Sequence, residues 1–200
     1  MRTRPLLHYL LLIGCIQAVL ICLFRPTAAQ VLLALAYLVL AHLVADFPLQ
    51  TNWVYRLKVR SLAGLALHAA THIVFTALII SDPLNYWLML ALIGLVHFTI
   101  DWQKLHWGGS ALAGFLLDQV IHITSLVLIA TIFPVQSTIP VEWLGPALAY
   151  ATLPALLMAL WVSAVDRRPG NRLNWWVRRH LSDVSQIVGL PLAAILLLAR

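Results

Sequence analysis

Long apolar runs separated by short polar stretches set the pattern along this chain. Seven such runs follow one another, at residues 6–24, 28–45, 61–80, 84–100, 111–133, 143–164 and 184–199. Each comes close to the length of about 20 residues with which a helix crosses the hydrocarbon core of a bilayer. Only helices and closed barrels satisfy their backbone polar groups there. The pattern therefore predicts an all-α protein, a polytopic transmembrane helical bundle of about seven spans.

The composition indicates that lipid is the solvent of this chain. Of its 200 residues, 62% are hydrophobic and only 10% are charged, whereas soluble domains have about 25% charged residues. The first run follows Arg2 and Arg4 and is longer than the roughly 7–15 apolar residues of a signal peptide. We therefore interpret it as a transmembrane helix, and Cys15 and Cys22 inside it as packing residues.

The basic residues fall almost entirely on one side of the predicted bundle. With seven spans, eleven of the thirteen Lys and Arg residues share the side of the N-terminus, and only Arg25 and Arg200 lie opposite. Basic loops stay in the cytoplasm, so we expect a multi-pass membrane protein with a cytoplasmic N-terminus. The net charge of +6 thus reflects membrane orientation, not nucleic-acid binding. The stretch 165–183 mixes arginines with Trp175 and Trp176, which is typical of contact with anionic lipid headgroups.

Four consecutive predicted helices each carry two side chains of metal-ligand type, spaced four residues apart. The pairs are His42/Asp46, His68/His72, His97/Asp101 and Asp118/His122. Residues four apart share a helix face and lie about 6 Å apart along its axis. Since the helices alternate in direction, each carboxylate lies nearer the cytoplasm and its histidine one turn deeper. We expect all eight side chains in two layers at the cytoplasmic end of the bundle.

Polar groups at this depth need partners, because a carboxylate at the bilayer centre costs about 2.5–3.5 kcal/mol. Imidazole and carboxylate without thiolate favour zinc, iron or manganese, and helical bundles also build dinuclear sites this way. The pattern predicts one or two divalent metal ions held by His42, Asp46, His68, His72, His97, Asp101, Asp118 and His122. Gln50 and Gln119 flank the carboxylates and are candidates to orient them. A proton relay or ion pathway, and bis-His haem or chlorophyll ligation, are the alternatives.

The chain also contains a short internal repeat. The stretch AHLVADFPLQTNW at 41–53 resembles VHFTIDWQKLHW at 96–107, so the second and third predicted helices look like a hairpin duplicated as the fourth and fifth. We divide the chain into an N-terminal helix at 1–27, a four-helix core with the polar pairs at 28–133, and a C-terminal pair of helices with a basic interfacial loop at 134–200.

The stretches AHLVADFPLQ, HAATH, VHFTID and LLDQVIH together resemble a bacterial integral-membrane family known as domain of unknown function 3307. The resemblance spans about residues 35–130 and includes the eight paired residues, Gln50 and Gln119. It implies a multi-pass protein of the bacterial inner (cytoplasmic) membrane but no established reaction. A looser similarity to membrane-bound metal-dependent hydrolases implies hydrolysis of a phosphoester or lipid substrate.

Metal-assisted hydrolysis is therefore one function that we predict. In this interpretation the metal activates water, one of Asp46, Asp101 and Asp118 is the general base, and the basic loop at 56–60, with Lys58, attracts an anionic headgroup. The alternative is a non-enzymatic accessory or cofactor-binding subunit of a larger complex, with other membrane subunits as partners. A cation-coupled carrier is a third option, which the duplicated hairpin favours.

Overall fold

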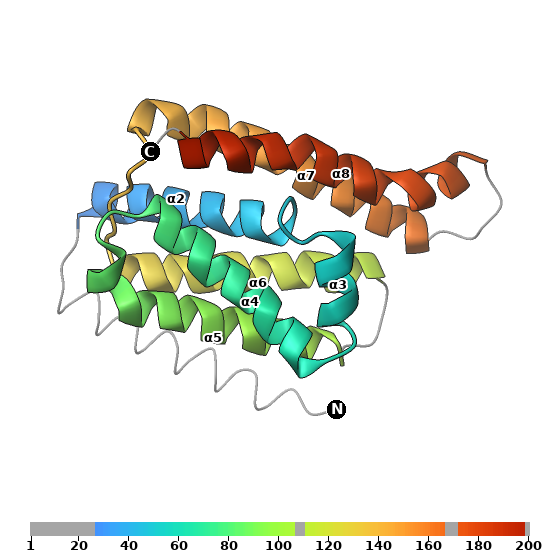
Figure 1. The fold of residues 1–200 in the computed structure, drawn as a ribbon, viewed down its shortest axis with the longest axis horizontal. Helices are drawn as coiled ribbons and strands as arrows, with labels where there is room; N and C mark the ends of the chain where they lie inside the picture. The colour runs from blue at the N-terminus through green and yellow to red at the C-terminus, as the bar shows by residue number, and fades with distance from the viewer. Residues whose placement is uncertain (1–26, 107–110, 167–171, 199–200) are drawn as a thin grey trace.

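The computed structural model describes residues 27–106, 111–166 and 172–198, and its regular elements within these ranges are helical (Figure 1). Side chains at 165–182 and 185 lie outside the description, as do the first predicted span and the residues His8, Cys15 and Cys22. The elements are α2 (Ala28–Asp46), α3 (Asn52–Lys58), α4 (Leu62–Ile79), the 3-10 helix η1 (Pro83–Tyr86), α5 (Trp87–Lys104), α6 (Ala111–Ile132), α7 (Val141–Asp166) and α8 (Arg172–Leu198).

Five of these helical segments are long and apolar enough to cross a membrane. They are α2, α4, α5 together with η1, α6 and α7. The apolar part of α8, Gln186–Leu198, is shorter than a span. The prediction of an all-α membrane-type protein is thus confirmed for the described residues, and the count of seven spans and the orientation stay predictions.

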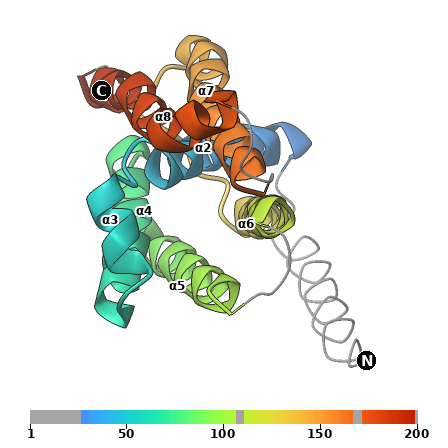
Figure 2. The same ribbon diagram turned by 90° about the vertical axis from the view of Figure 1, so that its right-hand side faces the viewer.

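The helices run back and forth along the long axis of the molecule, with α2 at the centre. Figures 1 and 2 show α7 and α8 on one side of α2, and α4, α5 and α6 on the other. The second half of α2 is buried all round: Leu40, Ala41, Val44 and Ala45 are each at most 1% exposed. A helix with apolar residues on all of its faces packs with all of those faces buried. The few polar residues of α2 therefore lie in the middle of the bundle.

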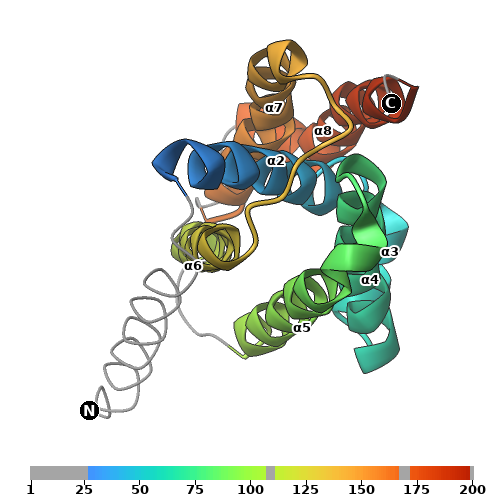
Figure 3. The same cartoon turned by 90° about the vertical axis from the view of Figure 1, so that its left-hand side faces the viewer.

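The chain segments at one end of the bundle are tied together by backbone hydrogen bonds. The Ser81 N–H donates to the Gln136 carbonyl at 2.9 Å, and the Thr138 N–H donates to the Ile79 carbonyl at 3.0 Å. The Tyr37 hydroxyl of α2 donates to the Ile139 carbonyl at 2.9 Å. These bonds join α2, α4 and the segment between α6 and α7 at the end that Figure 3 faces.

At the opposite end, α3 folds back over the bundle, and we call this end the cluster end. The side chain of Ser61 caps α4 by accepting a hydrogen bond from the Gly64 N–H at 3.0 Å. Gly64 lies against the backbone of Leu57 so closely that a Cβ at this position would overlap it. The absence of a side chain at Gly64 therefore lets α3 pack onto the first turn of α4.

Candidate metal centre

The structure brings all eight paired side chains together in one buried group, which we call the His/Asp cluster. Its members are His42, Asp46, His68, His72, His97, Asp101, Asp118 and His122. They lie on α2, α4, α5 and α6 near the cluster end, and none is more than 6% exposed. The spacing of four residues puts both members of each pair on the inner face of its helix, as the sequence predicts.

Four members of the cluster converge on one point, and we call them the Asp46 group: Asp46, His68, His72 and His97. Asp46 Oδ1 lies 3.1 Å from His68 Nε2 and 3.6 Å from both His72 Nε2 and His97 Nε2. The Nε2 atoms of His68 and His97 are themselves 3.1 Å apart. The edge of a tetrahedron with metal–ligand bonds of ~2.1 Å is about 3.4 Å. The measured separations surround this value, so the donor atoms fit a tetrahedral ion.

Two lysines that the sequence analysis does not assign to the cluster are ion-paired with the other two carboxylates. Lys58 Nζ lies 2.6 Å from Asp101 Oδ2, and Lys104 Nζ lies 2.5 Å from Asp118 Oδ2. Among the described side chains, Asp46 has no such ammonium partner. With all five imidazoles neutral, as metal ligands are, the three carboxylates and two ammonium groups leave one negative charge uncompensated, and that charge is centred on Asp46.

That the basic loop at 56–60 attracts lipid headgroups stays a prediction, but Lys58 is not available for this contact because its side chain is buried beside Asp101. The close contact at Gly64 holds α3 so that its last turn points into the bundle. The Gln50 side chain accepts a further hydrogen bond from Lys58 Nζ at 3.0 Å. Its neighbours Arg56 and Arg60 remain exposed.

For one of the two lysines, the sequence indicates that its side chain faces the cluster. Lys104 follows Asp101 by three residues, a spacing that puts both on the same face of α5 and directs the ammonium group inward. Lys58 carries no comparable signal, because a basic residue in a short loop looks the same whether it faces solvent or protein. Its role depends on how closely α3 approaches α4.

Several buried atoms of the cluster lack a hydrogen-bond partner within the described part of the chain. They include His72 Nε2, His122 Nε2, Asp101 Oδ1 and Asp118 Oδ1. More than nine in ten buried polar groups in proteins are hydrogen-bonded. A metal ion accepts lone pairs from imidazole nitrogen and carboxylate oxygen, so such unpartnered atoms fit a cation-binding role. A second group of possible ligands, Asp101, Asp118 and His122, lies beside the Asp46 group.

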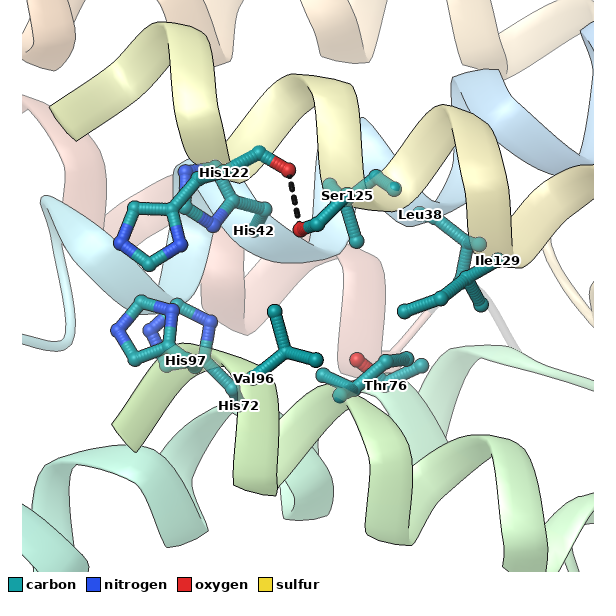
Figure 4. A pocket seen from close by; sticks show the side chains of 11 residues that line it. Leu38, His42, His72, Thr76, Val96, His97, His122, Ser125 and Ile129 are labelled. Carbon is teal, nitrogen blue, oxygen red and sulfur yellow. Dashed lines mark hydrogen bonds between the residues drawn. The ribbon is translucent and has the colours of Figure 1, made fainter. Parts of the chain in front are cut away.

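Four imidazoles form the deep layer of the cluster, as the sequence predicts. The rings of His72 and His97 stack with their centroids 3.5 Å apart, and those of His97 and His122 stack at 4.2 Å. Together with His42 they line a cavity of about 10 Å³, room for about one water molecule (Figure 4). The hydroxyl of Ser125 on its wall donates to the His122 carbonyl at 2.7 Å.

Gln119 links three members of the cluster. Its Nε2 donates to Asp46 Oδ2 at 3.0 Å and to Asp118 Oδ2 at 3.2 Å, and its Oε1 lies 3.3 Å from His42 Nε2. This is the orienting role expected of the residue. His106 lies outside the cluster, where it is exposed and its Nδ1 is 2.8 Å from the Trp102 carbonyl.

Comparison with known proteins places the cluster in a family context without assigning a reaction. The family model described as "Protein of unknown function (DUF3307)" matches residues 34–145. No curated protein and no solved structure matches the chain. The matched segment contains the whole cluster, Gln119 and both lysines. The function therefore has to be inferred from the site.

Proposed function

The chain belongs to this family of proteins of unknown function, and from that premise we propose that it binds a divalent transition metal at the Asp46 group. We further propose that the metal serves hydrolysis of a phosphoester or another lipid ester. The observation that carries the proposal is the convergence of one carboxylate oxygen and three imidazole nitrogens, from three helices, within 4.8 Å of one another. Tetrahedral metal sites are built from such donor sets.

The charges of the cluster favour one ion over two. Asp101 and Asp118 already have ammonium partners at 2.6 and 2.5 Å. A second divalent ion at these carboxylates would have to displace Lys58 or Lys104, or share the site with them at a cost in Coulomb repulsion. Asp46 is paired only with imidazoles and an amide, so a cation bound there displaces no ammonium group of the described residues.

The donor set also narrows the choice of metal. Three imidazole nitrogens and one carboxylate oxygen suit zinc or iron better than manganese, which prefers oxygen ligands. The cluster as described includes no thiolate ligand, which leaves zinc and iron as the ions that we propose.

In the proposed reaction, Asp101 is the general base. Its Oδ2 lies 3.1 Å from His97 Nε2 and 3.5 Å from His68 Nε2, so it borders the Asp46 group without belonging to it. Lys58 fixes the position of this carboxylate, which can accept a proton from a water that attacks the substrate. When bound, the metal polarises the ester oxygen and makes that water more acidic.

Metal analysis of the full chain, purified in detergent from medium containing zinc, iron and manganese, tests the proposal. We expect about one zinc or iron per chain by mass spectrometry, since four buried ligands suffice for a tetrahedral site. The variants Asp46→Asn and His68→Ala should lose the metal. The variant His106→Ala is the matched control, because it removes an exposed histidine outside the cluster.

Two results would overturn the metal site. One is a wild-type protein that stays metal-free after equilibration with zinc and with ferrous iron. The other is equal metal content in the wild type and in Asp46→Asn, with both proteins eluting as the same monodisperse species. The base role is tested separately in the double variant Lys58→Met with Asp101→Asn, which leaves no unpaired buried charge and should keep the metal but lose hydrolysis.

A further inference from the structure

A second cavity opens beside the Asp46 group at the cluster end, and we call it the Asp46 cavity. Its volume is about 120 Å³. This compares with an engineered apolar cavity of roughly 150 Å³ that takes up benzene. It is lined by Asp46, Phe47, Gln50, Asn52, Tyr55, Met158, Trp161 and Gln186. It is therefore large enough for a small organic group, and one of its walls is the ligand carboxylate that lacks an ammonium partner.

The lining has two chemically different parts. Phe47, Met158 and Trp161 supply apolar and aromatic surface, whereas Gln50, Asn52 and Gln186 supply neutral amides. Ligand pockets commonly combine a mostly apolar wall with a few polar groups that fix orientation. An amphiphile has the matching division between an apolar chain and a polar head.

The amides also connect the elements around the cavity. The side-chain amide of Asn52 on α3 donates to Asp183 Oδ1 on α8 at 2.6 Å. The Gln186 amide donates to Asn52 Oδ1 and to the Gln50 carbonyl, both at 3.4 Å. The cavity is thus built between α2, α3, α7 and α8, and its polar groups are held in place.

The charge of the lining selects among headgroups. Among the side chains that the structure describes, no Lys or Arg lines the cavity, and Asp46 is its one charged member. Recognition of phosphate relies largely on Arg and Lys side chains, and within the described part of the chain neither residue type faces the cavity. Amide side chains instead exchange hydrogen bonds with hydroxyl, ester and amide groups.

We infer that the Asp46 cavity is the substrate site and takes the uncharged, hydroxyl-bearing ester head of an amphiphile such as a monoacylglycerol. This inference rests on the proposed function and narrows its substrate to a carboxylic ester. In the reaction, the oxygen of water bonds to the acyl carbon and the bond from that carbon to the alcohol oxygen breaks. One proton of the water passes to the alcohol oxygen, which leaves a carboxylic acid and an alcohol.

Photo-crosslinking of the detergent-purified full chain tests this inference without relying on activity. The probes are a monoacylglycerol and a lysophosphatidate that carry the same diazirine-labelled acyl chain. We expect the monoacylglycerol to label the peptides around residues 47–55 and 158–161 about tenfold more than the lysophosphatidate does, which corresponds to ~1.4 kcal/mol.

Three variants sharpen the test. Met158→Phe fills the cavity and should lower labelling about tenfold, because an overpacked site excludes its ligand. Leu160→Phe is the matched control, since Leu160 lies on the same helix but is 60% exposed. Gln186→Arg adds a cation to the lining and should shift the preference toward lysophosphatidate.

The metal content of the same samples separates the two proposals. Bound metal without labelling at these peptides overturns the substrate site and leaves the metal centre intact. Labelling without metal overturns the proposed hydrolysis instead. Equal labelling by both probes in the wild type, or equal loss in Met158→Phe and Leu160→Phe, also overturns the inference.

Discussion

Lys58 contributes to the stability of the folded bundle through Asp101. Both side chains are buried, and their charged atoms are 2.6 Å apart. Removing one member of a buried ion pair leaves a charge without compensation, at a cost of about 3–5 kcal/mol. We expect Lys58→Met to lower the free energy of unfolding by this amount, as measured by denaturant titration in detergent micelles.

A double substitution distinguishes the ion pair from packing of the lysine chain. Adding Asp101→Asn to Lys58→Met should recover most of the loss, because neither charge then remains. Arg56→Met lies on the same helix but is exposed, and we expect it to stay within about 0.5 kcal/mol of the wild type. An equal loss in Arg56→Met, or no recovery in the double variant, would contradict the pairing.

At the scale of single residues, the sequence predicts those features of the cluster that depend only on the spacing of residues along a helix. The four pairs could be identified because a separation of four residues puts two side chains on one helix face whatever the tertiary packing. The partners of Asp101 and Asp118 depend on which elements approach each other. Spacing therefore predicts the cluster, whereas the contrast between Asp46 and the two lysine-bound carboxylates required the structure.

Among the elements, α3 depends most on a single position. A side chain at Gly64 would meet the backbone of Leu57, so Gly64→Ala has to push α3 away from α4. Overpacking of this kind costs about 1–3 kcal/mol. We expect a loss of stability in that range, measured by the same unfolding titration.

The matched control for Gly64 is another helical glycine. Nothing lies within 4 Å of a Cβ built at Gly114, so Gly114→Ala should be neutral or stabilise α6 by up to about 1 kcal/mol. If α3 acts by holding Lys58, Gly64→Ala should cost much less in the Lys58→Met background. Additive losses would show that the two positions act independently.

The elements themselves were predicted to different degrees. Five of the apolar runs correspond to helices of spanning length, because the length of an apolar run is enough to identify such a helix. The short helix α3 was expected to be a loop, since seven residues with two basic side chains show no apolar period. Its sequence signal is the N-capping residue Thr51, which marks where a helix begins but not how that helix packs.

For the whole molecule, the remaining question of orientation has a direct test. The basic residues predict that the cluster end faces the cytoplasm. In a variant without Cys15 and Cys22, we place single cysteines at Arg56 near the cluster end and at Leu84, which is 87% exposed at the opposite end. An impermeant maleimide should label Leu84→Cys in intact cells and Arg56→Cys only after permeabilisation. The reverse pattern would overturn the orientation.

The repeat noticed in the sequence corresponds to two helical hairpins that contribute equally to the cluster. Helices α2 and α4 supply two pairs, and α5 and α6 supply the other two. The lysines break this equality, because both bind carboxylates of the second hairpin. The sequence predicts the duplicated halves, and the difference between them lies in tertiary contacts that no local pattern encodes.

The two ion-paired lysines also bear on the order of events during biogenesis. Small zinc domains stay unfolded until they bind the ion, because nothing else in the chain stabilises their clustered ligands. Here Lys58 and Lys104 neutralise two carboxylates from within the chain, so one negative charge awaits a cation. Insertion and assembly of the helices can precede loading, and delivery of the ion becomes a separate, later step that cellular metal supply can control.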